Sequence, residues 1–320
     1  MLMVQSFATN VDTGYTMTKY LVCIIGPTAI GKTVLGIKLA NHFNTEIISA
    51  DSRQFYKEMS VGTAVPTKEE LAQAKHHFIQ HVFIEQNYNV GNFERDALSL
   101  LDSLFSKHDV VIMVGGSGLY MDAITKGLDN FPDVDNSIRE KLNDDLENKG
   151  LEFLQDQLKK LDESAYNSIA IDNPRRVTRA LEVCLQTGKP YSSFLQKNEN
   201  NRNFKSIYIG LDADRDVIYD RINQRVDNMI ENGLLDEAKA LLPKQHLNAL
   251  QTVGYKELFN YFKGDWTLDF AISEIKKNTR RFAKRQLTWY RKNEEVKWFD
   301  YLSDIDKVTN YISDEIKKPT

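Results

Sequence analysis

Residues 21–33 read LVCIIGPTAIGKT, and this stretch decides the fold. Its first five residues are apolar and predict a buried parallel strand. Residues 26–33 then match G-x-x-x-x-G-K-[ST], the phosphate-binding loop, and apolar residues follow at helical spacing. Strand, loop and helix stand in the order that the motif requires. We therefore predict an α/β fold with a P-loop NTPase-like parallel sheet core.

The phosphate-binding loop offers both backbone and side-chain groups to an anion. Its glycines let backbone N–H groups close around phosphate oxygens, and the following helix N-terminus adds a favourable dipole. Lys32 supplies a positive charge and Thr33 a hydroxyl ligand for Mg²⁺, the cofactor that we expect. The alternative is an ordinary glycine turn between a strand and a helix. The strand before the motif and the helix after it favour a phosphate site instead. The loop consists of Gly26, Pro27, Thr28, Ala29, Ile30, Gly31, Lys32 and Thr33.

The composition limits the functions that the chain can have. With 42% hydrophobic and 27% charged residues, the 320-residue chain is typical of a globular protein of one or two domains. No apolar run approaches the roughly 18 residues needed to cross a bilayer, so we expect no membrane contact. The net charge of −4 excludes a uniformly basic nucleic-acid binder. Two cysteines, Cys23 and Cys184, exclude a disulfide framework. Residues 1–16 lack Lys and Arg and predict no secretory signal, so we expect a cytoplasmic protein.

The sheet is predicted to continue on both sides of a helical insertion. Apolar runs at 45–50, 109–114 and 206–211 predict further strands. Residues 129–165 hold eleven Asp or Glu against five Lys or Arg, with helical patterning, and a polar linker at 197–203 follows. We therefore predict core segments at 1–122 and 204–320 with an all-helical insertion domain at 123–203. Beyond Asp214 we predict only helices. Three histidines are expected to be exposed or at a strand edge: His76, His77 and His81.

Asp51 follows the strand predicted at 45–50. Because ligands bind at the carboxyl ends of strands in open α/β sheets, Asp51 and Lys32 should face the same crevice. The pattern leaves three roles open for Asp51: a ligand of Mg²⁺, a partner of a hydroxyl group in a small-molecule kinase, or a general base. The strand predicted at 109–114 ends in a second close-approach glycine turn, GGSG at 115–118, rather than in a carboxylate.

Two pairs of arginines lie at i,i+4 spacing on predicted helices, so each pair shares a face. Arg175 and Arg179 lie in NPRRVTRALEV, and Arg221 and Arg225 lie in DRINQRVDNM. Each pair could bind an anion or form a solvated face with ion pairs. The acidic neighbours available for such ion pairs are Glu182 and Asp227.

The most basic stretch is 276–292, KKNTRRFAKRQLTWYRK, which holds eight Lys or Arg and no acidic residue. At about 100° per residue, Ile275, Phe282 and Trp289 fall within roughly 40° and predict an apolar stripe that packs on the core. The basic residues, including Arg280 and Lys284, occupy the opposite arc. In a chain of net negative charge, such a face is typical of a surface that binds a phosphate backbone.

Taken together, the motifs resemble the tRNA dimethylallyltransferases, also called tRNA isopentenyltransferases. The similarity covers about residues 19–300. A Walker A loop alone is shared by many families, whereas this ordered set is specific to one. Because no zinc-finger extension follows, we expect the bacterial type. The motifs are GPTAIGKT, IISADSRQFY with VGTAVP, VGGSGLY, NPRRVTRALEV with TGKP, RINQRV, TVGYKEL and NTRRFAKRQLTWYRK.

The resemblance implies transfer of a dimethylallyl group from dimethylallyl diphosphate to N6 of the adenine 3′-adjacent to the anticodon in tRNA. It implies that the phosphate loop holds the donor diphosphate. Asp51 would be the general base, Ser117 would contact the substrate, and Arg225 would neutralise the leaving diphosphate. Arg53 stands where the family often has an apolar residue. The residues implied to bind tRNA are Asp51, Ser52, Arg53, Gln54, Ser117, Arg139, Arg175, Arg176, Val177, Thr178, Arg179, Gln251, Thr252, Val253, Gly254, Tyr255 and Lys256, to which the basic face adds Arg280 and Lys284.

Two other functions are compatible with the phosphate loop. A P-loop kinase of a small-molecule hydroxyl would use Asp51 on the acceptor but would leave the basic face without a role. An RNA-binding module that only senses nucleotide would leave Asp51 without a role. We therefore expect a monomeric prenyltransferase that acts on the anticodon stem-loop of tRNA.

Overall fold

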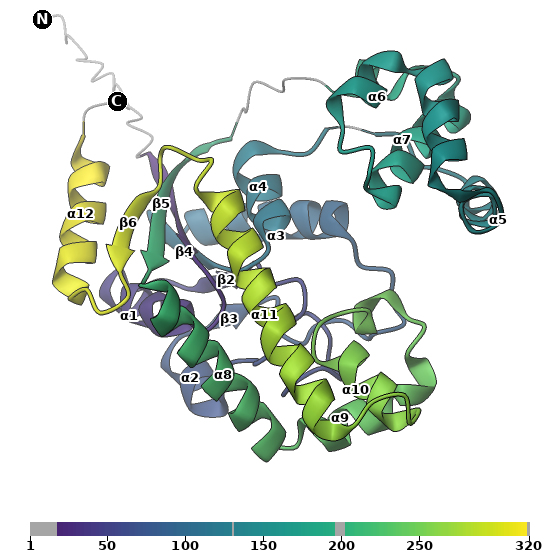
Figure 1. Cartoon of the computed structure of the whole chain (residues 1–320). Coiled ribbons are helices and arrows are strands. Elements are labelled where there is room, and N and C mark those ends of the chain that lie inside the picture. Colours follow the sequence, from purple (N-terminus) through teal and green to yellow (C-terminus); the bar gives the residue numbers. More distant parts are fainter. Residues whose placement is uncertain (1–17, 130, 196–201, 319–320) are drawn as a thin grey trace, which may run out of the picture. The chain divides into compact units, whose positions relative to one another are not determined.

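A parallel six-stranded sheet forms the centre of this computed structural model, which describes residues 18–129, 131–195 and 202–318 (Figure 1). The strand order is β3-β2-β4-β1-β5-β6. This arrangement confirms the predicted α/β fold class. Within the described residues, no helix has the length and apolar character to span a bilayer. Residues 1–16 and most of the predicted linker lie outside the described residues. The strands are β1 (Lys19–Ile25), β2 (Ile47–Ser49), β3 (His76–His77), β4 (Val110–Val114), β5 (Phe204–Asp212) and β6 (Lys297–Asp300).

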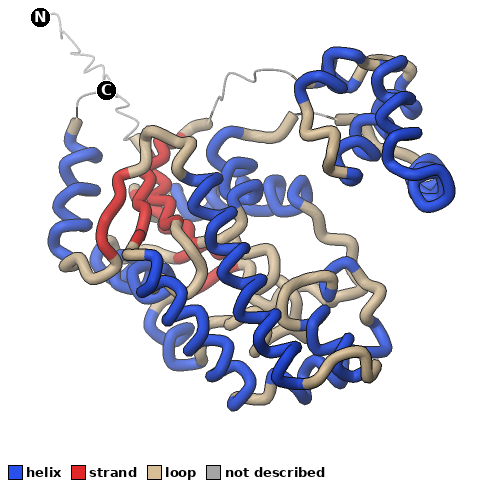
Figure 2. The backbone as a smooth tube through the Cα atoms, in the orientation of Figure 1, coloured by secondary structure: helices blue, strands red, loops and turns tan. Residues whose placement is uncertain are grey.

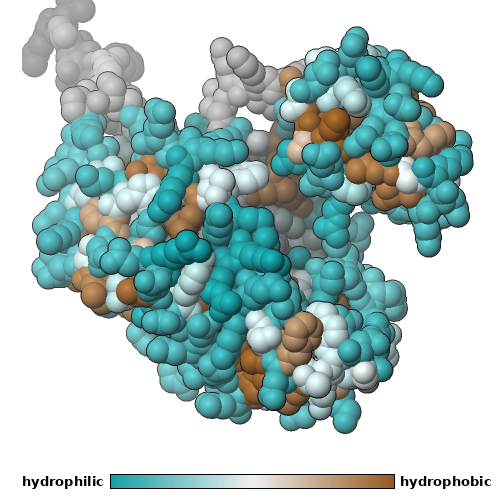
Figure 3. All heavy atoms as spheres, viewed as in Figure 1, coloured by the Kyte–Doolittle hydropathy of each residue, from teal (hydrophilic) through white to brown (hydrophobic). Residues whose placement is uncertain are grey.

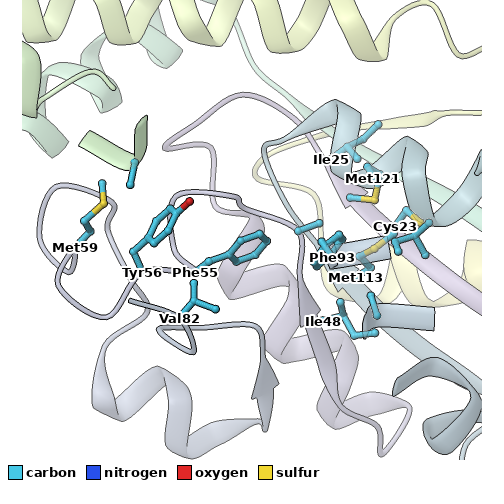
Figure 4. Packing of buried hydrophobic residues seen from close by; sticks show 14 of the residues in the cluster. Cys23, Ile25, Ile48, Phe55, Tyr56, Met59, Val82, Phe93, Met113 and Met121 are labelled. Carbon is cyan, nitrogen blue, oxygen red and sulfur yellow. The ribbon is translucent and has the colours of Figure 1, made fainter. Parts of the chain in front are cut away.

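Strands β1 and β4 are almost entirely apolar, as expected for strands in a sheet that helices cover on both faces (Figure 2). Leu21, Cys23 and Ile25 of β1 enter one hydrophobic cluster, and the residues between them enter another. Figure 4 shows part of the first cluster, where Cys23 and Met113 lie near Phe93. The helices that contribute only to the first cluster are α3 (Val90–Phe105), α4 (Gly118–Lys126), α9 (Leu234–Leu241) and α10 (Tyr255–Phe262). The second cluster takes α1 (Lys32–His42) and α12 (Ile305–Lys317), and the short α2 (Lys68–Gln73) follows β2. Two helices contribute to both clusters: α8 (Arg215–Glu231), with Val226 in the first, and α11 (Leu268–Tyr290), with Ala283 in the second.

Lys126–Asn201 form a second compact unit. Its described part contains helices and no strand, and it has a core of its own that includes Leu142, Leu154 and Leu181. Asn173 caps the helix that carries the first arginine pair, because its side chain accepts a hydrogen bond from the Arg175 N–H. The elements of this unit are α5 (Asn136–Leu161), α6 (Glu163–Ser168), α7 (Pro174–Thr187) and the 3-10 helix η1 (Tyr191–Phe194).

The prediction that only helices follow Asp214 is wrong at β6. This strand has four residues with Lys297 and Asp300 at its ends, so it shows neither an apolar run nor alternation. It forms at the edge of the sheet because its backbone pairs with β5 and Trp298 packs on Gly210. A Cβ at Gly210 would lie 2.5 Å from Cε3 of Trp298. Both contacts join distant segments, and a local pattern cannot reveal them.

The three histidines differ in their surroundings. His76 and His77 form β3 at the edge of the sheet, as predicted. The prediction is wrong for His81, because both of its ring nitrogens are buried and have no hydrogen-bond partner in the described structure. Its ring centroid lies 5.3 Å from that of Phe55 and 5.0 Å from that of Tyr88. Burial lowers the pKa of His81, with Asp96 opposing the shift and Lys57 adding to it.

We expect the His81→Phe variant to be less sensitive to acid than the wild type. Burial disfavours the protonated form of His81 in the folded protein, whereas the unfolded chain takes up a proton near pH ~6.5. The free energy of unfolding should therefore fall as the pH drops below about 6.5, and level off below the folded-state pKa. Phe keeps an aromatic ring in the cluster and does not titrate. Thermal melts across about pH 5 to 8 measure the effect, with exposed His246→Phe as the control. Identical pH dependence of wild type and His81→Phe would contradict the prediction.

Candidate active site

A cavity of about 1190 Å³ opens where β1, β2 and β4 end. Its wall begins with the loops that follow these three strands, and α8, α10 and α11 complete it. This is the end of a parallel sheet at which ligands bind. The predicted site residues that line the cavity are Thr28, Ala29, Gly31, Lys32, Thr33, Asp51, Ser52, Arg53, Gln54, Ser117, Arg225, Gln251, Thr252, Val253, Gly254 and Lys256.

The phosphate loop leaves β1 in a conformation that requires glycine. Gly26 has a φ of 143°, and a Cβ there would lie 2.5 Å from the carbonyl oxygen of Leu211 in β5. The Lys32 ammonium closes the loop by donating to the carbonyl oxygens of Gly26 at 3.0 Å and Pro27 at 2.7 Å. These two hydrogen bonds hold the lysine side chain against the backbone of its own loop.

The second arginine pair reaches this loop from α8. Arg221 donates through Nε to the carbonyl oxygen of Ala29 at 2.8 Å, and Arg225 donates through Nη1 to the Thr28 hydroxyl at 3.3 Å. The suggested ion-pair partner Asp227 instead contacts Lys276 at 2.6 Å. The solvated-face alternative is therefore wrong for this pair, because both arginines point at the phosphate loop.

Two cations at the loop are held in surroundings that disfavour their charge. Burial lowers the pKa of Lys32 to about 7, with Asp51 opposing the shift and Arg225 adding to it. Burial also lowers the pKa of Arg225, and Asp51 opposes that shift. An anion in the cavity would stabilise both charged forms. The loop and α8 thus form a binding site suited to a diphosphate.

Asp51 and Ser117 are brought together by the ends of β2 and β4. Asp51 accepts the Arg53 N–H through Oδ1 at 3.1 Å. Ser117 Oγ accepts the Ser52 N–H at 3.2 Å, and the two serine hydroxyls lie 3.1 Å apart. The strands can end this close together because Gly115 has no Cβ, which would lie 2.4 Å from the carbonyl oxygen of Ala50. A carboxylate and a hydroxyl therefore line the same cavity as the cationic loop.

The predicted apolar stripe of α11 is wrong as a core-packing face. Ile275 is buried, but Phe282 and Trp289 are 39% and 40% exposed and line the cavity. Trp289 is held by a 2.9 Å hydrogen bond from Nε1 to Asp122 and by contact with Gly118. A helical period identifies an apolar face but cannot distinguish a core from a cavity wall. Trp289 is consequently not the fully buried core anchor that the stripe predicted.

The outward face of α11 is strongly hydrophilic (Figure 3). Lys284 is exposed on it. Arg280 donates to the Asn223 side chain at 2.7 Å, and Arg291 pairs with Asp212 at 2.7 Å. α11 therefore exposes a basic face, on which two arginines are held by α8 and by the end of β5. That this face binds RNA phosphates stays a prediction.

Two arginines of the helical unit bind a buried carboxylate. Arg139 donates through Nε and Nη2 to the two oxygens of Glu182 at 2.6 and 3.0 Å, and Arg179 donates to Oε2 at 3.1 Å. Burial alone would raise the pKa of Glu182, but these hydrogen bonds outweigh it and the pKa is lowered. The ion-pair alternative is confirmed for Arg179, while Arg175 and Arg176 are exposed.

Three residues of the predicted tRNA-binding set have buried side chains: Val177, Thr178 and Tyr255. Tyr255 is inaccessible to solvent, and its hydroxyl donates to Glu237 at 2.6 Å. The side chains of these three residues are therefore not accessible to tRNA, so the predicted contact could involve only their backbone. The motif match extends over whole segments, whereas a helix turns some of its residues toward the core.

Gln286 lines the cavity, and the sequence patterns assigned it no role. It is buried, and it contacts both the phosphate loop and the glycine turn after β4. At about 100° per residue, it falls roughly 20° from Ile275, just beyond the edge of the predicted apolar stripe. A polar side chain beside that stripe was the available signal.

The cavity is better suited to a divalent cation that is bound to a diphosphate than to a divalent cation alone. Within the described residues, no group of three or more His, Cys, Asp or Glu is placed to hold a metal, and Cys23 and Cys184 are free and buried. Thr33 and Asp51 nevertheless offer hard oxygen atoms to one cavity. Mg²⁺ commonly uses such a small protein contribution together with phosphate oxygens and water.

Comparisons with known proteins show the family of this chain. Residues 54–293 match the family described as IPP transferase. The tRNA dimethylallyltransferase of Flavobacterium johnsoniae is 58% identical over 93% of this chain and 99% of its own, and that of Christiangramia forsetii is 61% identical over 94% and 99%.

Solved structures extend the similarity to the fold. A tRNA isopentenylpyrophosphate transferase from Bacillus halodurans is 39% identical over 93% of this chain and 97% of its own, with a TM-score of 0.70. A eukaryotic dimethylallyltransferase, solved in a study of its action on tRNA, is 26% identical over 93% and 77%, with a TM-score of 0.75. On this agreement of sequence and fold, the chain belongs to the IPP transferase family.

Proposed function

We propose that this protein transfers a dimethylallyl group from dimethylallyl diphosphate to N6 of the adenine 3′-adjacent to the anticodon in tRNA. The observation that carries the proposal is the arrangement of one cavity, in which a phosphate loop with Lys32 and Arg225 shares the wall with Asp51. The names of the relatives supply the substrate class.

The reaction exchanges a C–O bond for a C–N bond. The N6 lone pair attacks C1 of the donor, the C1–O bond breaks, and diphosphate leaves with the electron pair. N6 loses one proton, which Asp51 accepts. Lys32, Arg225 and the loop N–H groups stabilise the charge that develops on the departing diphosphate. The N6 amine is a poor nucleophile, and a positioned base can contribute about 10²–10⁴-fold to its reaction.

We assign Thr33 as the protein ligand of Mg²⁺ at the donor diphosphate. When bound there, Mg²⁺ adds positive charge beside the phosphate oxygens. The rest of the cationic environment comes from this chain itself. The loop holds Lys32 against Gly26 and Pro27, and α8 holds Arg225 against Thr28.

The acceptor adenine must leave its base stack to enter the cavity, as base-modifying enzymes require. Ser52 and Ser117 lie beside Asp51, where they can contact the entering nucleotide. The basic face of α11 and the exposed Arg175 and Arg176 of the helical unit supply positive charge for the phosphate backbone. We therefore propose the anticodon stem-loop of tRNA as the partner. We also propose that the protein acts as a monomer and that it is cytoplasmic.

A labelling assay tests the function. The protein is incubated with Mg²⁺, tRNA and dimethylallyl diphosphate labelled in the prenyl group. We expect label in the RNA, one diphosphate released per label, and no label in a tRNA with guanine at the target position. Phosphate transfer from ATP to a small hydroxyl compound, with no label in RNA, would favour a kinase instead.

We expect the basic face of α11 to set the salt dependence of tRNA binding. Lys284→Ala should lower the slope of log affinity against log salt by about 0.7–0.9, because one phosphate contact is lost. The Arg280→Ala, Lys284→Ala double variant should lose about twice as much. Binding titrations at several salt concentrations measure the slopes, with exposed Lys307→Ala on α12 as the control. Unchanged slopes in the double variant would mean that this face does not meet RNA.

A further inference from the structure

Gln286 connects two loops that the active site needs. Its Oε1 accepts the backbone N–H of Thr28 at 2.9 Å, and its Nε2 donates to the carbonyl oxygen of Gly116 at 2.8 Å. The side chain is buried, so both ends of the amide depend on protein partners. Thr28 belongs to the phosphate loop, and Gly116 immediately precedes Ser117.

The bridge lies between the groups assigned to the two substrates. On one side, the loop carries Lys32 and receives Arg225 through the Thr28 hydroxyl. On the other side, the turn at Gly116 carries Ser117 and lies beside Asp51. A Cβ at Gly116 would come 2.5 Å from Nε2 of Gln286 and 3.6 Å from Oδ2 of Asp51. The amide therefore fills the space that glycine leaves open.

We propose that Gln286 is a positioning residue, which uses its two hydrogen bonds to hold the donor loop and the acceptor turn at the separation that the reaction requires. The inference rests on the proposed function. In a transfer between two bound substrates, a misplacement of about 1 Å can cost on the order of 10²-fold in rate. An amide suits this role because one end accepts an N–H and the other donates to a carbonyl.

Two variants separate the bridge from simple packing. Gln286→Met keeps the length of the side chain but neither hydrogen bond, and kcat should fall about 10- to 100-fold, with tRNA affinity within about twofold of wild type. In Gln286→Glu, the ionised carboxylate can accept from Thr28 but cannot donate to Gly116. Once protonated, it can do both, so its rate relative to wild type should rise as the pH is lowered.

The control is Thr288→Ala on the same helix, because Thr288 is exposed and its hydroxyl donates to the Lys284 carbonyl oxygen of its own helix at 2.9 Å. This variant should keep the wild-type rate at every pH. Thermal melts of all variants establish that each variant is folded before the rates are compared. If Gln286→Met does not fold, the pH dependence of the Gln286→Glu rate ratio decides alone.

A kcat of Gln286→Met within about twofold of wild type would overturn the inference, as would a Gln286→Glu rate ratio that does not change with pH. Weaker tRNA binding at an unchanged kcat would also overturn it and make Gln286 an RNA contact. If the wild type transfers no label, the proposed function fails. Calorimetry with inorganic diphosphate then decides the inference: weaker binding by Gln286→Met supports the bridge, and equal binding overturns it.

Discussion

Replacing Asp51 with Asn should lower the rate of dimethylallyl transfer about 10²–10⁴-fold and leave tRNA affinity near that of wild type. A general base acts in the transition state, whereas the contacts that bind tRNA are made before it. Asn retains an oxygen that can accept the Arg53 N–H, so the turn after β2 should be preserved. Single-turnover rates with saturating donor, together with tRNA binding titrations, measure the two effects separately.

Asp304→Asn is a matched control for this substitution. Asp304 caps α12 by accepting the Asp306 N–H, a hydrogen bond of the same type as that of Asp51. This variant should therefore retain full transfer activity. If Asp51→Asn lost tRNA binding but kept its single-turnover rate, Asp51 would be a binding residue and the proton would go elsewhere.

Lys32→Met and Arg225→Met should each lower the rate of dimethylallyl transfer about 10²–10³-fold, because each cation stabilises the departing diphosphate. Burial at the loop lowers the pKa values of both side chains. Because both side chains are buried, solvent cannot easily compensate for the loss of either positive charge. Binding of tRNA without donor should change little, because Lys32 belongs to the phosphate loop and Arg225 points at it. Initial rates over a range of donor concentrations show whether kcat or KM carries the loss.

Arg215→Met provides the comparison on the same helix. Arg215 lies at the exposed start of α8, where it contacts Tyr219 and not the phosphate loop. Normal transfer by Arg225→Met would return Arg225 to the solvated-face alternative that its helical spacing also allowed. A loss confined to tRNA affinity in Lys32→Met would show that the loop holds RNA rather than the donor diphosphate.

The parts of the site that the sequence predicted are those made by neighbouring residues. The phosphate loop needs glycine where the chain passes β5, and the turn after β4 needs glycine where it approaches Ala50. Asp51 follows a strand whose direction is determined by the parallel sheet. Each of these features depends on a short stretch and on general rules for the carboxyl edge of a sheet. Residue order was therefore enough to predict one crevice with Lys32 and Asp51.

The sequence by itself determined the parallel α/β core, the helical insertion and the phosphate loop, because strand, turn and helix patterns are local. Only the tertiary structure decided that Arg225 reaches Thr28, that Trp289 forms a cavity wall rather than core, and that β6 joins the sheet. It also decided the role open to Gln286, whose bond to Thr28 joins residues 258 positions apart. Such contacts depend on how distant segments pack, and the period of a helix shows which residues share a face but not what that face meets.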